Sequence, residues 1–550
     1  MPGPLANPQR GDDGLSPIEV FVAGLGGTVA GAAAIVYLAG QLSARLTSGD
    51  WIDVGPSDLP EILRRLAAEP TDPAAAFAAA AGGVPGPVAF WTIAALLLLV
   101  PVVGAGWWLR RRGRRKRTSD EPEPARWATA ADLKPLIVKR PTPGRITLGT
   151  AHGKLLAAEP GHSLLVMGPT QSGKTTGLAI PAIRDWHGPV VATSVKSDLL
   201  DDTLATRMRR GDVWVYDPTR SIETMPTSTW SPLAGCDTWQ GALRTASWLT
   251  DAARSDGPGD AEFWLANAAK LLAPLLYAAA TSGRTIADVV RWVDTQETKE
   301  PKVELELVGE AEPINALEAT LRREERVRSS VYTTAETVLR AFADPQVARS
   351  AASSEISPDR LLAGGQHTLY ISAPMHEQGR LRPLFSTLVQ TLITSAYERA
   401  ASKGPIEPPL LLVLDEAANI APIRDLPQIA STAASLGIQL ITIWQDRTQI
   451  ATRYGNAAAT VVNNHRAKLM LSGIHDRATT DELTATLGDT ELTRRSTTTN
   501  HSGQASTSEV AQLRPLATAA TLRQARPFEG VLLYGAFPPA RLRLSGKRRT

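Results

Sequence analysis

Two long apolar runs lie near the start of the chain. Residues 20–40 contain no charged side chain, and a helix of that length is about 31 Å long, which matches a hydrocarbon core of about 30 Å. The second run, residues 88–109, has tryptophan or phenylalanine at both ends, as is typical of helices that meet two membrane interfaces. The pattern predicts two transmembrane helices.

The charges around these runs indicate their orientation. Seven basic residues lie within residues 110–117, and such a cluster marks the cytoplasmic side and can bind anionic lipid. Residues 1–19 are then cytoplasmic, and residues 41–87 form a short extracytoplasmic segment. A cleaved signal peptide is disfavoured because the first run lacks a basic leader, and the basic flank disfavours a buried core helix for the second.

Beyond a basic juxtamembrane segment and polar linker (residues 110–143), short β-rich runs alternate with helical stretches. Such alternation is typical of an α/β domain whose mostly parallel sheet is covered on both faces. The expected strands are residues 162–167, 190–194, 212–216, 410–414 and 439–444.

Residues 238–350 differ, because their apolar positions recur at helical spacing. We expect an all-α subdomain inserted into a nucleotide-binding domain formed by residues 144–237 and 351–550. Residues 497–508 are rich in Ser and Thr and low in apolar residues, and we expect a mobile loop there.

Composition narrows the function classes. The net charge is +3, so outside the basic cluster the rest of the chain carries −4. That balance disfavours a protein that coats duplex DNA through a general basic field. The single cysteine, Cys236, permits no internal disulfide and fits a reducing compartment.

The most specific motif is GPTQSGKT at residues 168–175, which fits the phosphate-loop pattern at every fixed position. Its backbone N–H groups would surround a phosphate, Lys174 would reach the β- and γ-phosphates of ATP, and the Thr175 hydroxyl would bind Mg²⁺. The predicted nucleotide-binding residues are Gly168, Pro169, Thr170, Gln171, Ser172, Gly173, Lys174, Thr175 and Thr176.

Two acidic residues follow the apolar run at residues 410–414. Asp415 is placed to bind the magnesium ion, and Glu416 to activate water as a general base. Gln445 ends another expected strand, where its amide could sense the γ-phosphate or orient the attacking water. A solvated strand-end amide is the alternative for Gln445.

Further segments resemble one family of motors. They are residues 144–149 (GRITLG), His162, residues 194–198 (SVKSD), residues 230–233 (WSPL), residues 415–419 (DEAAN), Gln445, Gln449, residues 454–455 (YG), residues 514–516 (RPL) and residues 538–539 (PP). Together with the two-helix anchor, they resemble the coupling ATPases of type IV secretion and conjugation, the TraG/TraD class.

The resemblance implies a RecA-like P-loop ATPase in the bacterial inner membrane, with both termini cytoplasmic and a helical cap. It implies a homohexamer that converts ATP to ADP and phosphate and moves a relaxase–DNA complex, with single- or double-stranded DNA, or protein effectors. The partner is a type IV secretion channel.

Two departures from the family pattern matter. The aromatic residue that the family has after Asp-Glu is Ala417 here, and the arginine that it carries before the next strand is Ala434. Another arginine would then act on the neighbouring subunit's site, and Arg447 is our first candidate, followed by Arg424 and Arg453.

Two other functions remain open. Translocases of the FtsK type usually end in a DNA-reading winged helix, and we expect none because the chain stops soon after a strand that we expect at residues 530–537. A nucleotide-gated membrane scaffold is disfavoured because Lys174, Asp415 and Glu416 are all present.

Overall fold

The computed structural model describes residues 17–48, 51–77, 87–112, 124–253, 261–419, 423–499 and 505–546. The chain divides into two compact units, Met1–Glu123 and Pro124–Thr550. Each unit has its own buried apolar cluster.

The regular elements described in the first unit are all helices. The long helices α1 (Pro17–Ser48) and α4 (Pro87–Arg112) pack against each other, with the short helices α2 (Leu59–Ala68) and α3 (Pro73–Ala76) between them in sequence. The Phe77 and Phe90 rings meet edge to face at 6.0 Å. The two helices include both runs that the sequence predicts to span a membrane.

One described helix is long and apolar enough, by length and composition, to cross a membrane. It is α8 (Ala261–Thr281), and 61% of its apolar stretch is buried inside the second unit, so it serves there as a core helix. In α4, the described apolar stretch is Pro87–Leu99, which is shorter than a membrane-crossing helix requires.

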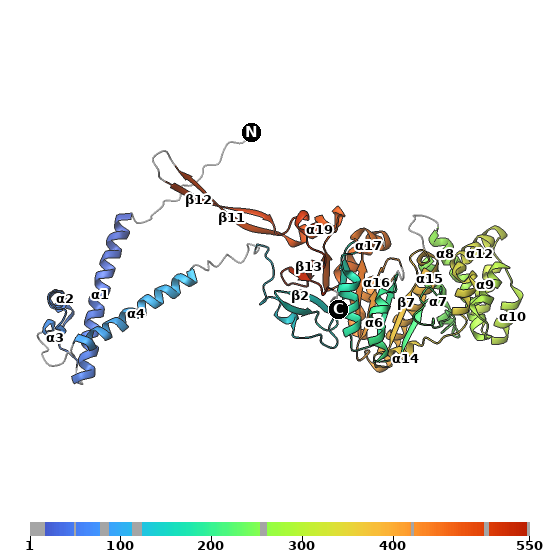
Figure 1. Ribbon diagram of the computed structural model, residues 1–550, viewed down its shortest axis with the longest axis horizontal. Coiled ribbons are helices and arrows are strands. Elements are labelled where there is room, and N and C mark those ends of the chain that lie inside the picture. The colour runs from blue at the N-terminus through green and yellow to red at the C-terminus, as the bar shows by residue number, and fades with distance from the viewer. Residues whose placement is uncertain are drawn as a thin grey trace. The chain divides into compact units, whose positions relative to one another are not determined.

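A mixed sheet forms the centre of the second unit (Figure 1). Its strands, in spatial order, are β1 (Ile137–Val138), β3 (Lys154–Ala157), β2 (Thr147–Ala151), β14 (Ala540–Arg543), β13 (Glu529–Tyr534), β10 (Ala467–Leu471), β4 (Leu164–Met167), β9 (Ile438–Trp444), β8 (Leu410–Leu414), β5 (Val190–Ser194), β7 (Thr368–Ser372) and β6 (Val213–Tyr216). From β10 to β6 every pairing is parallel, whereas from β1 to β10 every pairing is antiparallel. The prediction of a mostly parallel sheet is therefore correct for the half from β10 to β6, whereas the other half, which contains the strand expected at residues 530–537 as β13, is antiparallel.

The parallel strands are apolar on both faces because helices cover both faces. Helices α5 (Ile180–Asp185) and α6 (Asp198–Met208) share one apolar core with alternate residues of β4 and β5. Helix α15 (Gln378–Lys403) packs on the opposite face with the remaining residues of those strands. Burial on both faces is why these strands are continuous aliphatic runs.

The segment between β6 and β7 is helical wherever the structure describes a regular element. Its helices are α7 (Trp239–Ala253), α8, α9 (Ile286–Asp294), α10 (Lys299–Val308), α11 (Ala311–Leu321), α12 (Glu325–Leu339), α13 (Pro345–Ser350) and α14 (Pro358–Leu362). Helices α7, α9, α10, α11 and α12 all contact α8. Figure 1 shows most of these helices gathered at one end of the second unit.

After β9, the chain forms α17 (Arg447–Tyr454), α18 (Ala458–Asn464) and, beyond β10, α19 (Arg477–Leu487). Two strands, β11 (Asp489–Thr499) and β12 (Ala505–Pro515), then pair as a separate antiparallel hairpin (Figure 1). The prediction of a loop over residues 497–508 is wrong for both ends of that range, because pairing continues from Ser496↔Ser508 to Thr499↔Ala505. Thr is β-branched and suits a strand even where apolar residues are scarce.

Candidate nucleotide-binding site

The phosphate loop connects β4 to the helical turn that leads into α5. Gln171 and Gly173 have left-handed backbone angles, with φ of 64° and 95°. A Cβ at Gly168 would lie 2.6 Å from the Ser172 hydroxyl oxygen, so only glycine fits there. The buried Ser172 hydroxyl has no hydrogen-bond partner among the described residues, and such an unpaired group inside a wound loop is suited to a ligand oxygen.

Lys174 lies inside this loop and is only 7% exposed. Its ammonium group donates hydrogen bonds to the carbonyls of Gly168 and Pro169. Burial lowers the pKa of Lys174, and the nearby carboxylates of Glu416 and Asp415 oppose that shift. The loop therefore holds a cation where a phosphate chain would need one.

Thr175 and Asp415 meet although 240 positions separate them. The Thr175 hydroxyl donates to the Asp415 carboxylate over 2.9 Å. Burial raises the pKa of Asp415 to about 6, partly opposed by the hydrogen bond from Thr175. A hydroxyl and a buried carboxylate side by side are oxygen donors of the kind that Mg²⁺ prefers, so these residues fit the ion that the motif implies.

Glu416 and Gln445 follow the adjacent strands β8 and β9, and their side chains lie together. The Gln445 amide nitrogen is 3.4 Å from one Glu416 carboxylate oxygen, and the Asn419 amide lies 3.2 Å from the same oxygen. Glu416 has a left-handed φ of 56°, a strained conformation that for non-glycine residues clusters at functional sites. Thr175 is thus joined to Asp415, and Glu416 to Gln445, at the carboxyl ends of the parallel strands.

The family model for type IV secretory system conjugative DNA transfer matches residues 128–544. The chain belongs to this family. It is 26% identical over 332 residues to a conjugal transfer protein TraG of Escherichia coli, covering 55% of this chain and 51% of that protein. A TraG protein of Rhizobium radiobacter is 24% identical over 411 residues, covering 72% and 62%. The chain spans about half the length of the E. coli relatives it matches.

Solved structures of the conjugative coupling protein TrwB share the fold. The unbound form has a TM-score of 0.59 at 20% identity, covering 78% of this chain and 94% of that chain. TrwB in complex with ADP and Mg²⁺ has a TM-score of 0.58, also at 20% identity, covering 78% and 95%. The mixed sheet with its helical insertion is therefore the fold of known coupling proteins.

Two of the three arginine candidates pair with residues outside this cluster, and the third lines a cleft that includes Asn419. The Arg447 guanidinium is paired with Glu482, and Arg424 reaches Asp251 on α7 over 2.9 Å. Arg453 instead lines a small cleft with Arg382. Among the residues that the structure describes, these ion pairs direct Arg447 and Arg424 to Glu482 and Asp251 and not to Lys174, Asp415 or Glu416.

Sequence reasoning did not find two residues beside the site. The Arg382 guanidinium lies 3.4 Å from the carbonyl oxygen of Asn419, in the segment that follows Glu416. The Phe528 ring packs on the phosphate loop, because a Cβ at Gly173 would lie 2.5 Å from it. No motif surrounds either residue, and only the fold brings Arg382 to the segment after Glu416 and Phe528 to the phosphate loop.

Proposed function

We propose that this chain is an ATP-hydrolysing coupling protein that drives a relaxase–DNA complex, protein effectors or both into a type IV secretion channel. The observation that carries the proposal is the hydrogen bond between Thr175 and Asp415 beside the Glu416–Gln445 pair. It assembles phosphate binding, metal binding and water activation within one chain. Family membership supports the conjugative role.

In this proposal the phosphate loop binds ATP, and Lys174 holds the β- and γ-phosphates by charge. Thr175 and Asp415 hold Mg²⁺, which neutralises charge on the phosphates when bound. The Glu416 carboxylate accepts a proton from the attacking water, and the Gln445 amide keeps that carboxylate and the water in position. The products are ADP and phosphate.

We further propose that α1 and α4 cross the bacterial inner membrane, with both termini and residues 110–143 on the cytoplasmic side. The seven basic residues at 110–117 support this orientation and contact with anionic lipid. A cysteine at Ser57, which is exposed in the first unit, should react with an impermeant thiol reagent in intact cells, whereas buried Cys236 should not. Labelling of Cys236 alone would contradict the orientation.

The working form in this proposal is a homohexamer in which an arginine of one subunit acts on the nucleotide of the next. Arg447 remains our first choice and Arg424 and Arg453 the others, because the position where relatives carry arginine is Ala434. Ala434 is 3.1 Å from a Cβ built at Gly161, which lies just before β4, and β4 runs from there toward the loop. Position 434 therefore lies at the end of β4 that is away from the phosphate loop of the same chain, which is where an arginine that acts on a neighbouring subunit would lie.

The decisive experiment is transfer of a marked plasmid from donor cells that carry Lys174→Ala. We expect transfer to be lost, because the phosphates would have no cation within the loop. Lys154→Ala is the matched control, since Lys154 is an exposed lysine of the same unit, and transfer should be unchanged. Normal transfer by Lys174→Ala donors with normal protein levels would refute the proposal.

A further inference from the structure

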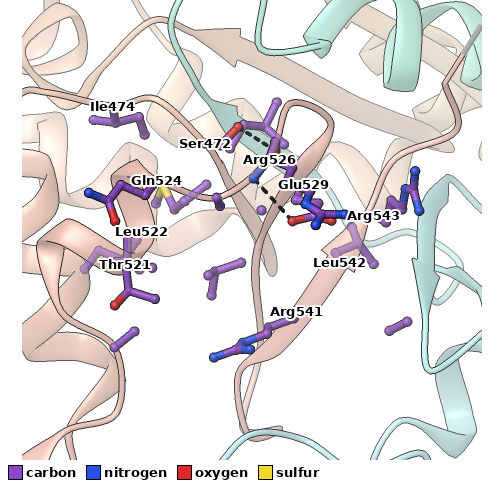
Figure 2. A pocket seen from close by; sticks show the side chains of 18 of the residues that line it. Ser472, Ile474, Thr521, Leu522, Gln524, Arg526, Glu529, Arg541, Leu542 and Arg543 are labelled. Atoms are coloured by element: carbon purple, nitrogen blue, oxygen red, sulfur yellow. Dashed lines mark hydrogen bonds between the residues drawn. The ribbon is translucent and has the colours of Figure 1, made fainter.

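The two sides of the phosphate loop differ in their acidic groups. Beside β10 lies a cavity of about 810 Å³. Glu529 is the one carboxylate among the described residues that line it, and its side chain accepts a hydrogen bond from the Arg526 backbone N–H (Figure 2). Beyond β8 and β9, by contrast, two side-chain amides meet the Glu416 carboxylate. The carboxylate that would activate water, and the groups that hold it, therefore lie after β8 and β9.

The two oxygens of the Glu416 carboxylate have unequal surroundings. The Asn419 side-chain amide donates to Oε2 over 3.2 Å, and the Gln445 amide lies 3.4 Å from Oε2 and 3.5 Å from Oε1. Oε1 is therefore the more weakly held oxygen and the one better able to accept a proton. Asn419 also donates its backbone N–H to the Glu416 carbonyl over 2.8 Å. This bond supports the left-handed backbone of Glu416, a conformation that persists only where surrounding contacts hold it.

Helix α15 in turn holds Asn419. The Nε atom of Arg382 lies 3.4 Å from the Asn419 carbonyl oxygen. Arg382 and Asn419 also line a cleft of about 230 Å³ together with Gln449, whose side chain accepts the backbone N–H of Gln445 over 2.9 Å. Both amides that reach Glu416 are therefore anchored at the same cleft.

The first turn of α15 also contacts the helical insertion between β6 and β7. The Arg380 guanidinium donates to the Ala341 carbonyl and to the Asp344 carboxylate, both over 3.2 Å. Asp344 caps α13 by accepting the Gln346 N–H, and this bond, with the nearby Arg380, holds the pKa of Asp344 below its usual range. Residues two positions apart on an α-helix point about 200° apart. The turn therefore contacts the insertion with one arginine and the Asn419 segment with the next but one residue, Arg382.

We propose that Asn419 is a positioning residue for Glu416, and that the first turn of α15 makes this positioning depend on the helical insertion through Arg380 and Arg382. The inference rests on the proposed function, because it takes Glu416 to accept the proton of the attacking water. A partner that displaces the insertion would then change the rate of hydrolysis without touching the nucleotide.

The first test measures hydrolysis and ATP affinity on the full chain in lipid nanodiscs. Asn419→Ala should lower kcat at least ~10-fold and leave the Kd and KM for ATP unchanged, because the described contacts of Asn419 are to Glu416 and Arg382 and not to the phosphate loop. Asn419→Asp keeps the shape of the side chain but removes the donor, so it should lose at least as much.

A double-mutant cycle distinguishes positioning from a general structural role. In the Glu416→Gln background, measured in single turnover, Asn419→Ala should have no further effect because no carboxylate remains to be positioned. A structural role would instead lower the rate by the same factor in both backgrounds.

The second test breaks the contact with the insertion. Asp344→Asn removes the charge that holds Arg380, and asparagine is itself a good N-cap, so α13 should keep its start. We expect kcat to fall at least ~3-fold in Asp344→Asn and in Arg382→Gln, and no further in the double variant, because both changes interrupt one path. Glu318→Gln is the matched control, since it removes an ion pair with Lys302 elsewhere in the insertion, and it should hydrolyse ATP as wild type does.

The outcomes separate this inference from the proposed function. If wild type hydrolyses no ATP, the proposed function fails. If wild type is active but Asn419→Ala keeps its kcat, loses ATP affinity as well, or is equally harmful in the Glu416→Gln background, the positioning role is overturned while the ATPase stands. If Asp344→Asn has no effect, or if its effect multiplies with that of Arg382→Gln, the dependence on the insertion is overturned.

Discussion

The two halves of the central sheet are built in different ways. The parallel half, from β10 to β6, presents strand ends at one edge, and Lys174, Asp415, Glu416 and Gln445 lie in segments that directly follow its strands. The antiparallel half joins strands from the two ends of the second unit, and Thr150 donates to the Arg543 carbonyl across 393 positions. The first half carries the groups that we propose act on the phosphates of ATP, and Phe528 of the second half packs on the phosphate loop.

The difference has a physical cause. Parallel strands all end at the same edge of the sheet. Short motifs that follow different strands therefore lie close together at that edge. An antiparallel strand alternates direction, so residues at that edge come from strand starts as well as strand ends. Changes in the parallel half should therefore affect chemistry, and changes in the antiparallel half should affect nucleotide affinity and stability.

The largest effect should follow from Glu416→Gln. The variant keeps Lys174 and should bind ATP normally, but it lacks the base that accepts the proton from water, so steady-state hydrolysis should fall at least ~10²-fold. Lys174→Ala should instead lose nucleotide affinity. Glu223→Gln, at an exposed position, is the control for both measurements. A Glu416→Gln protein with wild-type turnover would remove Glu416 as the base.

Next in size is the loss of the arginine that acts between subunits. Alanine variants of Arg447, Arg424 and Arg453 are compared at saturating ATP, and one should fall at least ~10²-fold because an inserted arginine stabilises transferring phosphate charge. Small amounts of that variant should inhibit wild-type assemblies more than dilution predicts.

The ion pairs of these arginines require separate controls. Glu482→Gln removes the partner of Arg447, and Asp251→Asn removes that of Arg424. If an acidic-partner variant loses as much activity as the arginine variant, the pair is structural. If all three arginine variants keep near-normal rates with assembly unchanged, the arginine lies elsewhere in the chain, and Arg382 is the first to examine because it contacts the segment after Glu416.

Sequence reasoning was most successful in the parallel half. The predicted strands at 190–194 and 410–414 agree with β5 and β8 at both ends, because strands buried on both faces are uninterrupted aliphatic runs. The phosphate loop and the Asp-Glu pair carry specific spacing, and the structure brings them together. Their catalytic roles stay predictions.

In the antiparallel half, the sequence predicted a strand at residues 530–537, near β13, but not its partners. Its pairings, such as Leu155 with Thr150 and Thr150 with Arg543, depend on segments far apart in sequence. Phe528 looks like any aromatic residue after a proline, and only the fold places its ring on Gly173. The hairpin residues 497–499 and 505–508 were predicted as a loop because Thr and Ser are common in both loops and strands.

A smaller effect concerns the acid stability of the protein and His465, which is fully buried just before β10. Its ring nitrogens meet the Thr442 hydroxyl and the Val461 carbonyl, and burial lowers its pKa from 6.5 to about 4. The unfolded chain therefore binds a proton at His465 more tightly than the folded chain does, and the stability that depends on a neutral His465 is complete above pH 6.5. It is lost as the pH falls toward 4.

At pH 5 the loss amounts to about 2 kcal/mol relative to pH 8. Urea unfolding at both pH values measures it, and in His465→Gln the pH-dependent loss should shrink by that amount. His475→Gln, at an exposed position, should retain the wild-type pH dependence. An unchanged pH dependence in His465→Gln would assign the acid sensitivity to other groups.

The smallest effect should come from the backbone of Phe528, whose φ is 67°. A side chain in this left-handed region costs about 1–2 kcal/mol relative to glycine. Phe528→Ala and Phe528→Gly both remove the ring that packs on Gly173 and Gly177, so the two variants should weaken ATP binding by the same amount. However, Phe528→Gly should be the more stable of the two by about 1 kcal/mol, because glycine relieves the strain.

Phe537 provides the control, because it is a partly buried aromatic residue of the same half without a positive φ. At this position the order should reverse, with the alanine variant more stable than the glycine variant. Urea unfolding of the four variants at pH 8 decides the matter: if Phe528→Gly is the less stable of its pair, the strain is not present in solution, and the Phe528 segment rests on the phosphate loop through packing alone.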